Sequence, residues 1–192
     1  MNIHPRSNSQ AGQESFVLEL TRNKLNGAYI EIGAGHPIVD SNTYILETEF
    51  SWRGISLEID QIKCNYFNQI RDNKCIETDA TIYNWVIYLK QVNWPSNFDY
   101  LQLDIEPAKN TFKALINFPI KEYKPSIITF EHDKYTGSFN WLFQISGFIY
   151  LTLHGYKRVS KDVTPFEHKN RIFEDWYVRK SFLKSGFNSS MS

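Results

Sequence analysis

The sequence predicts an α/β protein built on an open, doubly wound sheet. Short apolar runs rich in Ile, Leu, Tyr and Phe alternate with longer segments of helical pattern along the chain. Strands that alternate with helices form parallel crossovers, which place helices on both faces of a sheet. No repeat, low-complexity tract or linker divides the chain, so its 192 residues are expected to form a single domain.

Seven segments are predicted to be strands, since each is apolar and is bounded by polar or turn residues. They cover residues 28–33, 53–59, 74–78, 99–105, 126–132, 156–163 and 173–180. The intervening helical patterns cover residues 41–50, 61–72, 81–91, 108–118 and 138–153. Pro119 cannot continue the fourth of these helices, and Gly155 follows the last, where glycine often ends a helix.

The two ends of the chain are expected to lie outside the folded core. Residues 1–15 are polar and are predicted to form an arm, and residues 181–192 a flexible tail. The start lacks the apolar run of a signal peptide, and the most apolar stretch, residues 139–153, is too short to span a bilayer. Cys64 and Cys75 lack the spacing of a metal or redox pair. A reducing, cytoplasmic setting is therefore expected.

The formal charges balance, with 21 Lys and Arg against 21 Asp and Glu. A net charge of zero lacks the strong basic field that drives non-specific binding to nucleic acids. It also gives no reason to expect a charged membrane surface as a partner. Neither nucleic acid nor membrane is therefore an expected partner.

The candidate site lies beyond the carboxyl ends of the strands, where ligands bind in open parallel sheets. The first predicted strand ends in Glu31, Ile32, Gly33, Ala34 and Gly35. Its two glycines permit a tight turn and a close approach of the backbone to a ligand, although a plain strand-to-helix turn would look the same. A dinucleotide fingerprint fits poorly, because Ile38 stands in place of its third glycine.

Acidic residues follow the next two strands. Glu58 ends the second, where a carboxylate can accept hydrogen bonds from both hydroxyls of a ribose. A solvated surface acid is the alternative, but the neighbouring glycine turn favours ribose. Asp79 follows the third strand, where it could accept from the exocyclic amine of adenine or cap the next helix.

The densest group of ionisable residues follows the fourth and fifth strands. Asp104 and Glu106 end the fourth, and Glu131, His132 and Asp133 end the fifth. An unpaired acid is costly to bury in a parallel strand, which suggests a functional site, a metal or a helix cap. A hydrogen-bonded turn with ordinary surface acids is the alternative. We expect this group to be the reaction centre.

Six segments, taken in order, resemble the FkbM-type methyltransferases. They are SQAGQESFVLEL, YIEIGAG, SNTYILE, WRGISLEID, DYLQLDIEPA and EDWYV, and they span residues 9–178. This family belongs to the Rossmann-like methyltransferases, which use S-adenosylmethionine. The resemblance implies methyl transfer from that cofactor, and a seven-stranded, mostly parallel sheet whose last strand is antiparallel.

The resemblance also implies roles for residues at the strand ends. The residues around the methionine part of the cofactor would be Glu31, Gly33, Ala34 and Gly35. The residues around its ribose and adenine would be Glu58, Ile59, Asp79 and Ala80. Asp104 would lie near the methyl group, and Gln10 and Asn42 would be further members of the cofactor pocket.

The chain departs from the family after the fourth strand. Many members have Asp-Val-Glu-Gly there, whereas this chain has Asp104, Ile105, Glu106 and Pro107. Proline lacks an N–H and suits the first turn of a helix. The family's contacts between this loop and substrate therefore do not carry over.

The resemblance leaves two mechanisms open at the acceptor. The sulfonium is already activated, so the protein must position the acceptor and help to remove its proton. His132 is the candidate base, since the unperturbed pKa of imidazole is about 6.5. Alternatively, Asp104, His132 and Asp133 would hold Mg²⁺ or Mn²⁺ and lower the pKa of the acceptor hydroxyl. These three residues are both the predicted catalytic residues and the predicted metal ligands.

The predicted activity is O-methylation of a small-molecule or sugar hydroxyl. The rivals are a non-catalytic cofactor-binding module on the same fold and an NAD-dependent oxidoreductase, which the missing third glycine and the position of Glu31 disfavour. The acceptor is expected to be recognised by strand-end loops such as residues 135–137, by the N-terminal arm or by a second subunit of a homo-oligomer.

Overall fold

The strands of the protein are those expected, with bounds that differ by at most two residues. They are β1 (Ala28–Ile32), β2 (Arg53–Glu58), β3 (Lys74–Glu77), β4 (Asn97–Leu103), β5 (Lys124–Glu131), β6 (Tyr156–Val163) and β7 (Glu174–Arg179). The computed structural model describes residues 3–188.

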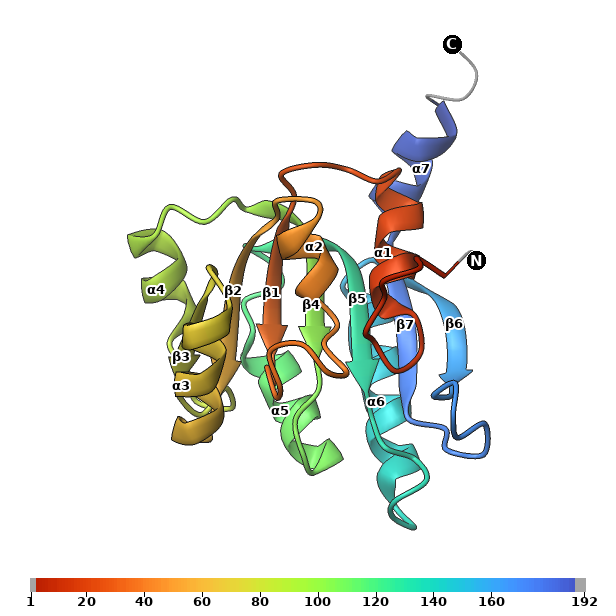
Figure 1. Ribbon diagram of the computed structural model, residues 1–192. Coiled ribbons are helices and arrows are strands. Elements are labelled where there is room, and N and C mark those ends of the chain that lie inside the picture. Colours follow the sequence, from red (N-terminus) through yellow and green to blue (C-terminus); the bar gives the residue numbers. More distant parts are fainter. Residues whose placement is uncertain (1–2, 189–192) are drawn as a thin grey trace.

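All seven strands join one sheet in the order β3-β2-β1-β4-β5-β7-β6 (Figure 1). Strands β1 to β5 pair in parallel, and β7 lies antiparallel between β5 and β6. The mostly parallel sheet with an antiparallel last strand is thereby confirmed. The strand order reverses between β1 and β4, which is the place where open α/β sheets bind ligands.

Helices lie before, between and after the strands. They are α1 (Gln13–Thr21), α2 (Tyr44–Thr48), α3 (Gln61–Ile70), α4 (Trp85–Gln91), α5 (Ala108–Asn117), α6 (Asn140–Leu153) and α7 (Lys180–Asn188). The Asp60 carboxylate begins α3 by accepting from the backbone N–H groups of Ile62 and Lys63. Helix α4 begins four residues later than expected, because Asn84 rather than Asp79 is its N-cap.

Two apolar layers cover the two faces of the sheet (Figure 1). On one face, α1 and α2 pack through Val17 and Leu46 against Tyr29 of β1. On the other face, α4, α5 and α6 pack against a cluster that includes Ile30 and Ile128. Successive side chains of a strand point to opposite faces. Polar side chains at odd-numbered and even-numbered positions of one strand therefore point toward different layers.

The described part of the predicted arm, residues 3–15, does not stand apart from the fold, contrary to the prediction. Ser9 and Ala11 are buried, and α1 begins at Gln13. Glu14 is also buried, and its carboxylate accepts from the backbone N–H groups of Asn8 and Ile45. These bonds satisfy polar groups that burial would otherwise leave unpaired, so a polar segment can pack against the sheet.

The predicted tail begins as a helix. Helix α7 covers Lys180–Asn188, and residues 189–192 lie outside the described residues.

Cys64 on α3 and Cys75 on β3 are both buried free thiols. None of the helices within residues 3–188 has the length and apolar character needed to cross a bilayer.

Candidate functional site

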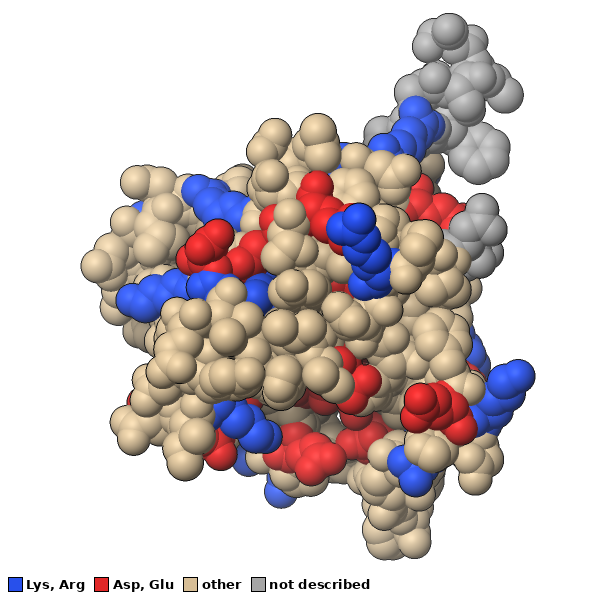
Figure 2. All heavy atoms as spheres, viewed as in Figure 1, with Lys and Arg blue, Asp and Glu red and all other residues tan. Residues whose placement is uncertain are grey.

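Acidic side chains gather where the parallel strands end. Figure 2 shows Asp and Glu side chains around a hollow at the lower edge of the molecule, the edge toward which β1, β4 and β5 point in Figure 1. This is the carboxyl edge of the sheet, at which the sequence places the candidate site. The residues of this edge come from the ends of β1, β2, β4, β5 and β7.

The glycine turn after β1 has positive φ at both glycines, the backbone conformation that glycine permits in a tight turn. Gly33 has φ +90°, and a Cβ there would lie 1.7 Å from the backbone oxygen of Asp104. Gly35 has φ +56°, and a Cβ there would meet nothing within 4 Å. The first glycine thus lets the turn pack against the end of β4, whereas the second borders open space. Ala34 between them is buried in a cluster with Cys64 and Phe67.

Glu58 is tied directly to this turn. One carboxylate oxygen accepts from the backbone N–H of Gly35 at 2.9 Å, and the other from that of Asp60 at 3.0 Å. A carboxylate offers about four lone-pair directions, so these two bonds leave acceptor capacity on both oxygens. The structure therefore places Glu58 beside the open space at Gly35, with capacity to accept from further donors.

The residues predicted to lie around the adenine are near the ends of β2 and β3. Ile59 is 68% exposed at the end of β2. Ala80 is buried, and the Asp79 carboxylate accepts from the backbone N–H of Thr81 at 2.8 Å. Asp79 therefore stabilises the turn in which it lies and does not cap α4.

Glu31 lies away from the turn to which the resemblance assigns it. The side chain is buried, and its two oxygens accept from the Thr43 hydroxyl at 2.9 Å and the Ser56 hydroxyl at 2.7 Å. Burial raises its pKa to about 7 in spite of these bonds and of the nearby Arg71 charge. Both oxygens are thus already engaged between β1, β2 and the start of α2. Glu31 supports the turn from inside the protein.

Asn42 and Gln10 have different surroundings. Asn42 is buried, and its side-chain oxygen has no hydrogen-bond partner among residues 3–188. A buried acceptor without a partner is costly, which is consistent with a site awaiting a donor. Gln10 is exposed, and its backbone oxygen accepts from the N–H of Phe166 at 2.9 Å. Gln10 thus joins the N-terminal segment to the loop between β6 and β7.

Three carboxyl groups meet at the ends of β4 and β5. Glu131 hydrogen-bonds to both Asp104 and Asp133. Burial, opposed by the Glu131 bond and reinforced by the Asp133 charge, raises the pKa of Asp104 to about 6. Burial and the neighbouring charges raise the pKa of Glu131 well above its ordinary value, and burial also raises that of Asp133. Such a cluster retains a proton near neutral pH, because closely spaced like charges cannot all ionise.

His132 does not belong to this cluster, which corrects the prediction. The ring is fully buried, lies near Phe130, and has its Nε2 atom 3.5 Å from an Asp175 oxygen. Against the effect of burial, His132 and Arg158 help to lower the pKa of Asp175 to about 2. His132 follows Glu131 directly, so the alternation of the strand turns the two side chains to opposite faces. The predicted base therefore points away from the acidic edge.

The predicted metal site does not assemble for the same reason. Asp104 and Asp133 lie on the acidic edge, whereas His132 is paired with Asp175 on the other side of β5. Across residues 3–188, no group of three or more His, Cys, Asp or Glu side chains is arranged to hold a metal ion. The described residues thus do not fit the metal centre that the sequence suggests.

Glu131 and Glu174 are the site residues that the predicted catalytic set omits. Glu174 pairs in register with Glu131, is fully buried, and has one oxygen without a hydrogen-bond partner in the described part of the chain. Burial raises its pKa to about 8. The alternation of side chains along β5 is the signal that could have identified Glu131, rather than His132, as a neighbour of Asp104. No pattern in the sequence around Glu174 marks it as a site residue, because only the pairing of β5 with β7 brings it beside Glu131.

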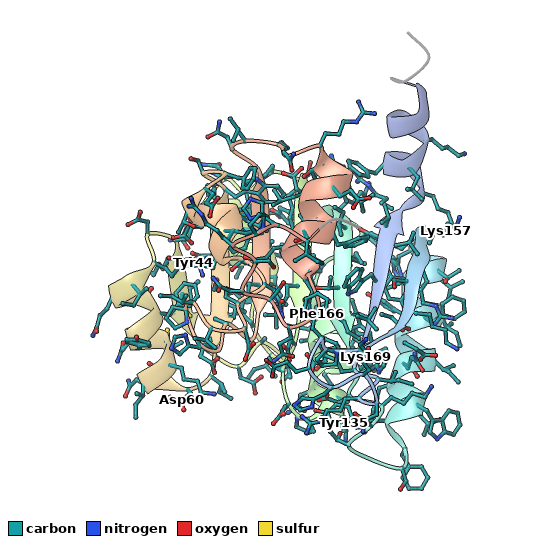
Figure 3. The ribbon with its side chains drawn as sticks, turned by 45° about the vertical axis from the view of Figure 1, so that its right-hand side comes forward. Tyr44, Asp60, Tyr135, Lys157, Phe166 and Lys169 are labelled. Carbon is teal, nitrogen blue, oxygen red and sulfur yellow. The ribbon has the colours of Figure 1, made fainter. Side chains whose placement is uncertain are left out.

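Two loops border the acidic edge. Figure 3 shows Tyr135, from the loop between β5 and α6, at the same end of the molecule as Phe166 and Lys169, from the loop between β6 and β7. The Arg171 guanidinium lies 5.7 Å from the centre of the Tyr135 ring. The Phe173 backbone oxygen joins the loops by accepting from the N–H groups of His132 and Asp133. Aromatic and basic side chains thus stand beside the carboxyl cluster.

Solved structures of methyltransferases share this architecture. A proposed O-methyltransferase from Klebsiella pneumoniae superposes with a TM-score of 0.60 and 13% identity, covering 91% of this chain and 83% of that one. An O-methyltransferase from Bacillus cereus, in complex with SAH, gives 0.58 and 12%, covering 93% and 85%. A TehB-like SAM-dependent methyltransferase from Corynebacterium glutamicum gives 0.54 and 12%, covering 88% of each chain.

The sequence alone matches no protein-family model, and no curated protein resembles it significantly. At identities this low, the structural likeness concerns the path of the backbone and says nothing of substrate. The protein therefore has the Rossmann-like fold that these methyltransferases share.

Proposed function

We propose that the protein transfers a methyl group from S-adenosylmethionine to a hydroxyl of a small-molecule or sugar acceptor. The observation that carries this proposal is the juxtaposition of the open glycine turn, with Glu58 beside it, and the Asp104–Glu131–Asp133 cluster. The first fits an adenosyl cofactor and the second a proton acceptor. The likeness of six segments to the FkbM-type family supports the same assignment.

The residues around the turn fit the cofactor in four respects. The space at Gly35 can admit a ligand next to the backbone, and Glu58 retains acceptor capacity for ribose hydroxyls. Asn42 offers a buried acceptor that lacks a partner among the described residues, and Ile59 offers an exposed apolar surface for a base. When bound there, S-adenosylmethionine supplies an activated methyl group.

The carboxyl cluster supplies the acid–base chemistry that a hydroxyl acceptor requires. An alcohol is a poor nucleophile near neutral pH, so its proton must pass to a base as the new bond to carbon forms. Burial raises the pKa of Asp104 to about 6 and that of Glu131 well above its ordinary value, so Asp104 is the carboxyl that we expect to act as the base. An Asp104 oxygen can then accept the proton of the acceptor hydroxyl, while Glu131 and Asp133 hold it in place.

The experiment is a thermal shift of the purified protein with S-adenosylmethionine, S-adenosylhomocysteine or NAD(H). A ligand at about a hundred times its dissociation constant adds about 2.7 kcal/mol of stability, which is easily detected. We expect stabilisation by the two sulfur ligands and none by NAD(H). The variant Glu58→Gln should lose most of this stabilisation, because an amide accepts hydrogen bonds through only one atom.

The matched control is Glu77→Gln, since Glu77 is exposed on β3 and lies in register with Glu58. It should leave the shift unchanged. A folded sample that neither sulfur ligand stabilises would rule out the methyltransferase and favour a non-catalytic module. Stabilisation by NAD(H) alone would favour the oxidoreductase.

A further inference from the structure

The side chains on the rim of the acidic edge are arranged as an aromatic platform with a cation at one end. Tyr135 is 46% exposed, and Arg171 lies over its ring at 5.7 Å. Arg171 is itself exposed and makes no ion pair with any carboxylate of residues 3–188. A guanidinium held on a ring by a cation–π contact keeps its planar edge available for a ligand.

Tyr135 also stands between charges of opposite sign. Its hydroxyl lies within the electrostatic reach of Asp133 and Glu131 and of Arg171. The loop that carries it is fixed, because the Asp133 backbone oxygen accepts from the Thr136 N–H at 3.0 Å and from the Asn140 side chain at 2.9 Å. The platform is therefore bordered by the carboxyl cluster on one side and by a cation on the other.

This arrangement suits a ligand with a ring, a hydroxyl and a negative charge. We propose that the acceptor is a sugar bearing a carboxylate, whose ring face lies on Tyr135 and whose carboxylate pairs with Arg171. This inference rests on the proposed methyl transfer at the same site. The sugar hydroxyl then lies toward the Asp104–Glu131–Asp133 cluster, where Asp104 accepts its proton.

A carboxylate suits the platform better than a phosphate monoester does. The carboxylate carries one charge and matches the planar fork of a single guanidinium. A phosphate monoester carries about −1.5 to −2 at pH 7. The second charge would face the acidic edge, where the Asp133 charge repels it.

The test compares the binding of methyl β-D-glucuronide and methyl β-D-glucoside, which differ only at C6, where the first has a carboxylate and the second a hydroxymethyl group. Binding is measured by ligand-observed NMR, with and without S-adenosylhomocysteine. We expect the glucuronide to bind about three- to tenfold more tightly at low salt, and the difference to shrink as salt is added. Because the sugars are also titrated alone, failure of S-adenosylhomocysteine to bind is a separate result that concerns the proposed function.

Three variants test which residues produce the preference for the glucuronide. Arg171→Gln should remove the preference for the glucuronide, and Tyr135→Leu should weaken the binding of both sugars. Lys157→Gln is the matched control, because it removes the same charge from an exposed site that Figure 3 shows far from Tyr135. Equal binding of the two sugars, binding of neither at millimolar concentration, or an equal effect of Lys157→Gln would each overturn the proposal.

Discussion

Asp104 is the residue whose ionisation the proposed chemistry requires. Burial and the neighbouring acids raise its pKa to about 6, so the carboxylate form dominates at neutral pH while enough basicity remains to accept a proton. Glu131 contributes through Asp104, because it hydrogen-bonds to Asp104 and keeps its own proton at higher pH. In this coupled pair, Asp104 therefore acts as the base and Glu131 supports it.

Replacing Asp104 with Asn should separate the two members of this pair. The pKa of Glu131 should fall, because part of its elevation comes from the Asp104 charge. Titration of ¹³C-labelled carboxyl groups by NMR measures this directly. Methyl transfer should fall by about a hundredfold or more, the usual contribution of a general base. Glu122→Gln, at an exposed position before β5, should change neither quantity, and an unaltered Glu131 titration in Asp104→Asn would contradict the coupling.

The turn after β1 is the element that joins the fold to the candidate cofactor site. Its two glycines have separate functions, since Gly33 packs against the Asp104 backbone and Gly35 borders open space. Glu58 closes the turn by accepting from the Gly35 N–H. The pairing of β1 with β2 and β4 thus sets the position of the turn, and the acid from β2 fixes its shape.

Alanine substitutions should show the two functions of the glycines. Gly33→Ala should destabilise the fold by about 3 kcal/mol or more, because it combines positive φ with a severe clash against backbone. Gly35→Ala should cost only about 1–2 kcal/mol, the strain of a left-handed residue.

Urea unfolding measures both stabilities, and the thermal shift with S-adenosylhomocysteine measures binding. Only Gly35→Ala should fold nearly as well as the wild type yet lose the ligand. Retention of the full ligand shift in Gly35→Ala would show that the ligand does not occupy this space.

A group of buried acids on one face of the sheet affects the stability of the whole molecule. Glu14, Glu31 and Glu174 are all buried, and burial raises the pKa of each. A carboxyl group with a raised pKa in the folded state retains a proton that the unfolded chain has already lost. Stability therefore falls as pH rises between the unfolded and folded pKa values.

Glu174 should show this effect most clearly, because its folded pKa of about 8 lies well above the ordinary glutamate value of 4.5. Wild-type stability should decline relative to Glu174→Gln between pH 5 and pH 8, by at least about 1 kcal/mol or about 2–4 °C in Tm. Thermal unfolding at several pH values measures the difference. Glu19→Gln, at an exposed position of α1, should track the wild type, and parallel curves for wild type and Glu174→Gln would contradict the assignment.

The sequence by itself determined the strands and the edge of the sheet that carries the candidate site. The apolar runs predict every strand, because burial of a strand imposes an apolar pattern that does not depend on its neighbours. The acids after β2, β4 and β5 lie at one edge because the carboxyl ends of parallel strands share it. The N-terminal segment was misjudged, since its polar side chains are satisfied by partners that are distant in sequence, such as Ile45 for Glu14.

Only the tertiary structure decided which of these acids act together. His132 and Glu131 are adjacent in the chain, yet the alternation of β5 sends one to Asp175 and the other to Asp104. Glu174 joins the same face through the antiparallel pairing of β7 with β5, and Arg171 reaches Tyr135 across two loops. Contacts of this kind depend on which strands and loops are neighbours in space, a property that the local pattern of residues does not specify.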